Sequence, residues 1–182
     1  HADLAGLLRQ GGTDVHDIAE RASAREPAGR VAAGAVAAQL LAQVGARVAG
    51  YVVRVGPRAS SASPRSAADA ARRAARSAFY GLRPADDRAW KRLVDRAKAR
   101  GDSLGGVVEV RADGLPAGLG SCFQHDARLD ARLAGALMSV QAVKGVEIGL
   151  GFAAAERFGS EVHDPIVRRG GRLARTRNHA GG

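Results

Sequence analysis

The sequence is poor in the residues that cross-link small secreted proteins and in those that stack on nucleic-acid bases. Its 182 residues include one cysteine, Cys122, which excludes an internal disulfide framework. Aromatic residues make up 4% of the chain, and no basic run alternates with rings, so we expect no nucleic-acid partner. No apolar run is as long as a membrane span and no signal peptide is recognisable, which predicts a cytoplasmic protein without a membrane partner.

Several catalytic and cofactor motifs are also missing. The five histidines do not have the paired spacing of metal ligands, so we expect no metal site. No GxSxG motif marks a nucleophile, and the absence of GxGxxG and Walker loops argues against a Rossmann domain. These absences leave charge, glycine-rich loops and helix ends as the informative features.

Arginine dominates the charged residues. The formal net charge is +10, and Lys91, Lys98 and Lys144 are the only lysines. The abundance of Ala, Gly and Arg is typical of a high-GC coding sequence, which raises the charge without any partner. Arginines beside glycine-rich loops are better explained by an anionic small substrate, because the guanidinium fork suits phosphate and carboxylate.

Helical and strand patterns alternate along the chain, which predicts a mixed α/β (α+β) fold. Residues 13–20 resemble a polar turn. The Ser/Ala/Arg-rich segment 58–76 is expected to be a surface insertion or loop with one loose helical stretch over 67–76. Periodicity and stop signals predict helices over 23–44, 84–100 and 129–140, and strands over 48–55, 107–110 and, after a turn, within 141–149.

The stretch from Arg21 to Glu26 is the most informative helix end. Ser23 and Glu26 have capping-box spacing before a long Ala/Val/Leu run, so we expect free backbone N–H groups and a positive dipole end here. Arg21 and Arg25 flank that end, which predicts an anion site. A capped helix with solvated arginines is the alternative. Pro27 removes one amide from the first turn and strains Glu26.

Seven short motifs occur in a fixed order over almost the whole chain. They are His1-Ala2-Asp3, Arg21 to Glu26, Arg30 to Ala35, Gly101 to Gly106, Leu129 to Ala134, Met138 to Gly149 and Asn178 to Gly182. Together they resemble the chorismate synthase family. The resemblance implies a partial β-α-β sandwich, with residues 1–182 forming a single incomplete domain from the central part of a homotetrameric enzyme.

The resemblance also implies an activity. The family's reaction is the anti-1,4-elimination of phosphate from 5-enolpyruvylshikimate 3-phosphate, giving chorismate, a carbon–oxygen lyase step of aromatic amino acid biosynthesis. Reduced FMN is required, and NADPH is a candidate reductant for it. By similarity, Arg21, Ala22 and Ser23, together with Gln141 and Ala142, contact the flavin. Arg25 matches a substrate-binding arginine, and His1 matches a catalytic histidine that handles a proton.

Two departures from the family pattern fall beside these positions. Pro27 stands where the family usually has Thr, and Leu150 stands where it has Asp in a Gly-Asp-Gly-Phe turn. The family's other active-site histidine, further substrate arginines, an FMN loop and a catalytic aspartate are absent, so we expect this piece to be inactive alone. A non-catalytic anion- or RNA-binding α/β domain and a decayed relative remain as alternatives.

Overall fold

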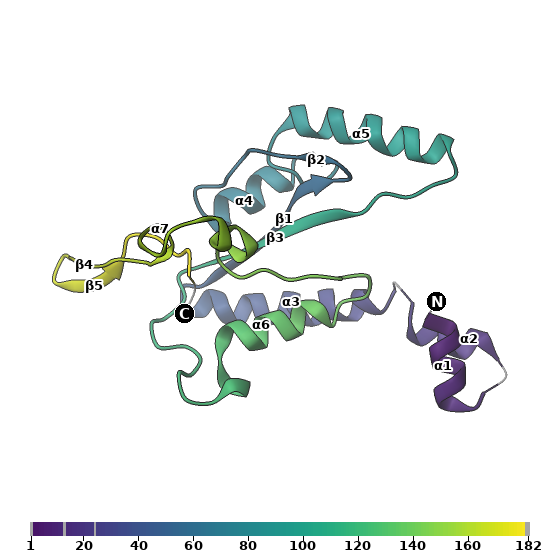
Figure 1. The fold of residues 1–182 in the computed structure, drawn as a ribbon, viewed down its shortest axis with the longest axis horizontal. Helices are drawn as coiled ribbons and strands as arrows, with labels where there is room; N and C mark the ends of the chain where they lie inside the picture. The colour runs from purple at the N-terminus through teal and green to yellow at the C-terminus, as the bar shows by residue number, and fades with distance from the viewer. Residues whose placement is uncertain (1, 13, 24, 181–182) are drawn as a thin grey trace. The chain divides into compact units, whose positions relative to one another are not determined.

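The computed structural model describes residues 2–12, 14–23 and 25–180. Its contacts divide the chain into two compact units, the first made of His1–Ala32 and Gly118–Gly182 and the second of Ala33–Ala117. Helix α3 (Glu26–Gln43) begins in the first unit and ends in the second. The mixture of helices and strands confirms the predicted α+β class (Figure 1).

The second unit is built on an antiparallel sheet in the order β2-β1-β3. Strand β1 (Arg47–Val55) confirms the predicted strand, and β3 (Gly106–Asp113) extends the predicted one at both ends. Strand β2 (Arg58–Ala59) is short and pairs with the end of β1 after a turn through Gly56, whose φ of 53° suits glycine. In the β1–β3 register Tyr51 lies opposite Glu109, and its hydroxyl donates a hydrogen bond to that carboxylate.

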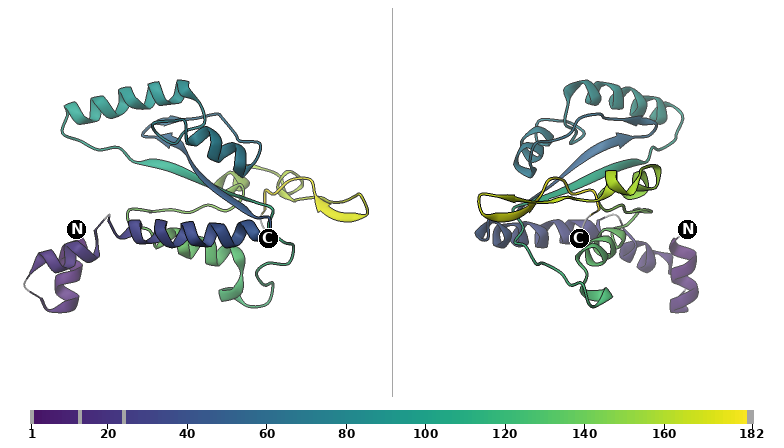
Figure 2. Two further views of the ribbon diagram at one scale, coloured as in Figure 1. Left: turned by 180° about the vertical axis from the view of Figure 1, so that it is seen from behind. Right: turned by 60° about the vertical axis from the view of Figure 1, so that its left-hand side comes forward.

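Helix α4 (Ala67–Ala74) covers one face of this sheet, as both views in Figure 2 show. Its buried residues Ala67, Ala70 and Ala74 follow helical spacing and pack with Ala49 and Tyr51 of β1. The helical stretch expected over 67–76 is confirmed as α4, but one of its faces is buried rather than part of a surface insertion. Small alanines let the helix approach the strand closely, whereas the sequence pattern of Ser, Ala and Arg looked like a solvated loop.

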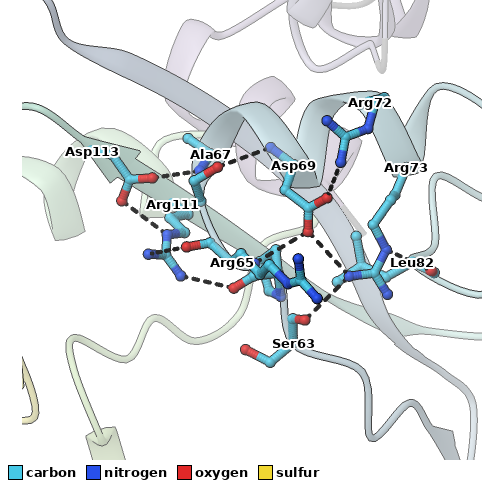
Figure 3. Close-up of polar contacts among 11 residues, drawn as sticks. Ser63, Arg65, Ala67, Asp69, Arg72, Arg73, Leu82, Arg111 and Asp113 are labelled. Carbon is cyan, nitrogen blue, oxygen red and sulfur yellow. Dashed lines mark hydrogen bonds and ion pairs between the residues drawn. The ribbon is translucent and has the colours of Figure 1, made fainter.

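A network of arginines and aspartates ties α4 to β3 (Figure 3). The Asp113 carboxylate accepts hydrogen bonds from the Ala67 backbone amide and from Nε of Arg111, at 2.9 Å for the latter. On the helix itself, Asp69 accepts from Arg73 Nη1 at 3.3 Å. The buried alanine face is thus held in register by charged groups at its rim.

Helix α5 (Pro84–Ala99) confirms the predicted amphipathic helix and carries the only tryptophan of the chain. Trp90 is fully buried and its Nε1 donates to the Arg58 carbonyl at 2.9 Å, which fixes the β1–β2 hairpin to the helix. Asp86 is also buried and accepts from Ser60 Oγ at 2.6 Å. This end of α5 is therefore anchored by both apolar and polar contacts.

The first unit contains short elements. Residues expected to form a polar turn instead form α2 (Val15–Arg21), because Asp14 caps its start by accepting from the His16 amide at 2.8 Å. No strand forms over 141–149, where the chain makes a turn at 141–142 and is irregular over 143–148. The remaining elements are α1 (Ala2–Gln10), η1 (His125–Ala127), α6 (Leu129–Met138), η2 (Gly151–Glu156), α7 (Gly159–Val162), β4 (Ile166–Arg169) and β5 (Arg172–Arg175).

Candidate functional site

The predicted capping box does not form, because α3 begins at Glu26, two residues later than a Ser23 cap requires. Glu26 is the first helical residue, and its amide donates to the Ser23 carbonyl at 3.2 Å. The Ser23 hydroxyl instead accepts from the Arg25 amide at 3.1 Å. A helix starting at Ser23 would need a donor at position 27, which proline lacks, so the start moves to where that missing amide is harmless.

The later start changes what the helix end offers to an anion. The Glu26 and Ala28 amides already donate to the Ser23 and Arg25 carbonyls, at 3.2 and 3.0 Å, and Pro27 has none. The expected cluster of free N–H groups is therefore reduced. Attraction for an anion comes instead from the positive dipole end of this 18-residue helix and from the arginines beside it.

Glu26 uses its side chain along the helix. Its carboxylate accepts both bonds from Arg30 Nε, at 2.9 and 3.0 Å. The same guanidinium donates to the hydroxyl and the carbonyl of Ser139, at 2.6 and 3.1 Å. Since Ser139 ends α6, one arginine joins the start of α3 to the turn that follows α6.

The electrostatics of Glu26 bring two predicted flavin-contacting stretches together. The hydrogen bond from Arg30 lowers the pKa of Glu26 most, and Gln141 and Arg21 lower it further against the opposing effect of burial. Glu26 is therefore a carboxylate at neutral pH. Because Gln141 and Arg21 both act on it, the stretches 21–23 and 141–142 lie around the same helix end.

The turn after α6 has two features typical of a ligand site. The side-chain oxygen Oε1 of Gln141 is buried and has no hydrogen-bond partner among the described residues. Ala142 has φ of 67°, a left-handed conformation that is uncommon for a residue with a Cβ and that often marks functional turns. An unsatisfied acceptor beside a strained residue indicates that a donor from outside the described residues completes this turn.

The other predicted residues are placed as follows. Arg21 ends α2 and is exposed, as is Ala22, while Ser23 is half-buried. Arg25 is exposed, and its guanidinium makes no hydrogen bond or ion pair within the described ranges, so its charge is available to a ligand. His1 lies outside the described residues. No group of His, Cys, Asp and Glu in the described part of the chain is arranged to hold a metal.

A second ordered turn lies near the carboxyl end of the chain, in the motif that begins at Asn178. The Asp164 carboxylate accepts from the amides of His179 and Ala180, at 2.6 and 3.1 Å, and these bonds lower its pKa, opposed by burial. The His179 carbonyl in turn accepts from the Leu150 amide at 2.8 Å. The turn 178–180 is thus bound to the segment that holds Leu150. The motif beginning at Asn178 indicated this turn, but the sequence analysis missed Asp164, which holds it.

The comparisons identify this arrangement. A family model described as chorismate synthase matches residues 1–182. The chain belongs to the chorismate synthase family. Proteins named chorismate synthase from Desulforudis audaxviator and Trichlorobacter lovleyi are 53% identical over 184 residues and 52% identical over 190 residues. These alignments include 100% of this chain but 47% and 48% of the relatives, so the chain spans about half the length of the curated relatives it matches.

The fold agrees with the sequence comparison. A crystal structure of chorismate synthase matches with a TM-score of 0.94 at 44% identity, covering 100% of this chain and 57% of that chain. The turn after α6 and the start of α3 therefore belong to a chorismate synthase fold. In the described part of the chain, no helix has the length and apolar character needed to cross a bilayer.

Proposed function

We propose that the intact protein to which this chain belongs is a chorismate synthase that eliminates phosphate from 5-enolpyruvylshikimate 3-phosphate. The observation that carries the proposal is the family match over residues 1–182. The geometry of the first unit supports it. The side chain of Gln141 acts on Glu26 at the positive end of α3, its buried amide oxygen is unsatisfied, and the neighbouring Arg25 has no side-chain partner among the described residues. A substrate with one phosphate and two carboxylates needs such cations.

The residues present fit a flavin mononucleotide. Arg21 and the dipole of α3 suit its phosphate, and the buried Gln141 oxygen lacks the donor that a ring N–H or a ribityl hydroxyl would supply. The left-handed Ala142 fixes the direction of the backbone there. The chemistry that reduced FMN contributes when bound is transient donation of electron density as the phosphate leaves.

The side chains of this chain bind the substrate and hold the binding groups in position. The free guanidinium of Arg25 binds a phosphate or carboxylate of the substrate. Arg30 holds the Gln141 turn against the start of α3 by bridging Glu26 and Ser139, so that substrate-binding and flavin-binding groups keep one geometry. His1, by similarity, handles the proton, and NADPH is the proposed reductant. A homotetramer in the cytoplasm is the proposed working state.

We further propose that the 182-residue chain does not turn over by itself. Three large aliphatic side chains of α3, Val31, Val36 and Leu40, are exposed by 71%, 69% and 72%. Helices with such faces pack against other elements, and about half of the relatives' length is outside this chain. Assay of chorismate formation under anaerobic conditions, with reduced FMN and saturating substrate, should give product with the intact protein and none with the chain.

Binding experiments on the intact protein separate the two ligands. Arg25→Ala should raise the KM for the substrate about 10- to 100-fold, since a charged hydrogen-bond donor is lost, and leave the Kd of reduced FMN nearly unchanged. Gln141→Leu should instead raise the Kd of reduced FMN. Arg9→Ala, an exposed change on α1, is the matched control. Salt-sensitive binding of RNA without any flavin binding would favour the non-catalytic alternative.

A further inference from the structure

A small groove in the second unit is lined by three arginines. It has a volume of about 220 Å³ and is formed by Pro57, Arg58, Ala89, Arg92, Leu93 and Arg96. None of these residues is among those proposed to contact flavin or substrate. We call this feature the arginine groove.

The charges of the arginine groove are not neutralised by the protein. Two basic residues of this region are paired, Arg83 with Asp86 at 2.8 Å and Lys91 with Asp95 at 2.8 Å, whereas Arg88 and Lys98 of α5 make no ion pair within the described residues. The side chains of Arg58, Arg92 and Arg96 are exposed and make no hydrogen bond or ion pair with any described residue. Three guanidinium groups around one groove repel one another, and an anion relieves that repulsion.

The buried carboxylate of Asp86 does not neutralise the arginines of the groove. Arg58 contributes to the lowered pKa of Asp86, but less than Arg83 does. The carboxylate oxygens of Asp86 already accept from Ser60 Oγ and from two nitrogens of Arg83. The hydrogen bonds of Asp86 therefore join the start of α5 to Ser60 after the hairpin, and the arginine groove keeps its net positive charge.

The groove is held in place by the surrounding structure. The Arg58 carbonyl accepts from Nε1 of the buried Trp90, so the backbone of β2 is fixed to α5 beside the groove. Arg92 and Arg96 are four residues apart and therefore lie on one face of α5. Pro57, Ala89 and Leu93 add apolar surface to the lining. A cationic site with an apolar floor suits an anion that carries an apolar group.

We propose that the arginine groove binds a phosphomonoester dianion whose organic part is small and apolar. Each arginine fork can bind two phosphate oxygens at once. Three arginines around one groove therefore suit a single, doubly charged phosphate group. The volume of about 220 Å³ is below the usual range for drug-sized ligands, so a nucleotide is too large. The apolar floor distinguishes an organic phosphate from free phosphate.

The test is a calorimetric titration of the intact protein with phenyl phosphate and, separately, with inorganic phosphate. The groove component of binding should weaken about 10-fold in Arg92→Ala and in Arg96→Ala, because each loses a charge-assisted hydrogen bond. Arg92→Lys should also weaken it several-fold, since the fork is lost. Arg76→Ala removes an equal charge from an exposed position outside the groove and is the matched control. Arg25→Ala changes the candidate substrate site and should leave this component intact.

Three results would overturn the proposal. One is binding that Arg76→Ala weakens as much as Arg92→Ala, which would indicate non-specific attraction. Another is inorganic phosphate binding as tightly as phenyl phosphate, which would remove the role of the apolar floor. The third is binding of single-stranded RNA that depends as much on Arg88 of α5 and on Arg100 at its C-cap, both outside the groove, as on Arg92, which would make this helix a nucleic-acid surface.

Discussion

Replacing Asp86 by alanine should destabilise the second unit strongly. The carboxylate of Asp86 is 2% exposed and accepts from Ser60 Oγ at 2.6 Å and from Arg83 Nε and Nη2 at 3.0 and 2.8 Å. Asp86→Ala removes the acceptor for all three donors while the donors stay in place. Asp86 also lies in the first turn of α5, where a negative charge is favourable.

The magnitude follows from how far the donors can be rehydrated. Removing one partner of a buried ion pair costs about 3–5 kcal/mol when the other charge stays buried. The side chain of Arg83 is 43% exposed, so water can replace part of the lost bonding. We therefore expect a loss of about 3 kcal/mol in the free energy of unfolding, at the low end of that range.

Trp90 makes the measurement direct, because it is the only tryptophan and is fully buried in this unit. Urea unfolding followed by its fluorescence should show a midpoint about 2–3 M lower for Asp86→Ala, given a slope of about 1–1.5 kcal/mol/M. The control is Asp95→Ala, which breaks the exposed pair with Lys91 and should cost under about 0.5 kcal/mol. Equal midpoints for the two variants would refute the reasoning.

The same residue predicts a pH dependence. The pKa of Asp86 in the folded state is lowered, and hydrogen bonds from Arg83 are the largest cause. Burial acts in the opposite direction but is outweighed. The stabilisation is therefore fully present above the unfolded pKa of about 3.9 and is lost as the pH falls through the lower folded value. The wild type should exceed Asp86→Asn in the free energy of unfolding by the largest amount at neutral pH. This difference should shrink towards zero in acid. A gap that persists below the folded pKa would contradict this.

Three further predictions use other contacts. Tyr51→Phe should cost about 1 kcal/mol in the same urea assay, because it removes the hydroxyl that bonds across the sheet. Gly114→Ala should cost about 2–4 kcal/mol, since φ is 74° and a Cβ would clash with the carbonyl oxygen of Gly45. Asp164→Ala should speed hydrogen exchange of the His179 amide about 10-fold or more, and unchanged exchange would show that the carboxylate does not order that turn.

The parts of the fold that sequence predicted well are those in which periodicity and stop signals agree. In α5, a proline and two acids begin the helix, apolar residues repeat through Trp90, and Gly101 follows its end. The valine-rich β1 ends at a glycine turn, and α6 has a single apolar face with no proline. In each case the local preference and the tertiary environment require the same structure.

The errors come from residues whose role depends on distant partners. The alanines of α4 follow helical spacing, but such small side chains become core only because β1 offers a matching surface. The hairpin of β4 and β5 turns at Gly170 and Gly171, both with positive φ, but its strands are rich in arginine and no strand was predicted there. The valines of 141–149 suggested a strand, but no partner strand lies beside them.

The candidate site shows the same division at the level of single residues. Residue types pointed to Arg21 and Arg25, and the family resemblance pointed to Gln141. Neither predicted the link by which Arg30 reaches Ser139, since more than a hundred positions separate that pair. Pro27 looked like damage to a capping box. In the structure it instead sets where α3 begins, which frees the Glu26 carboxylate from the cap and makes it available to Arg30. The proline therefore belongs to the arrangement that joins α3 to the Gln141 turn.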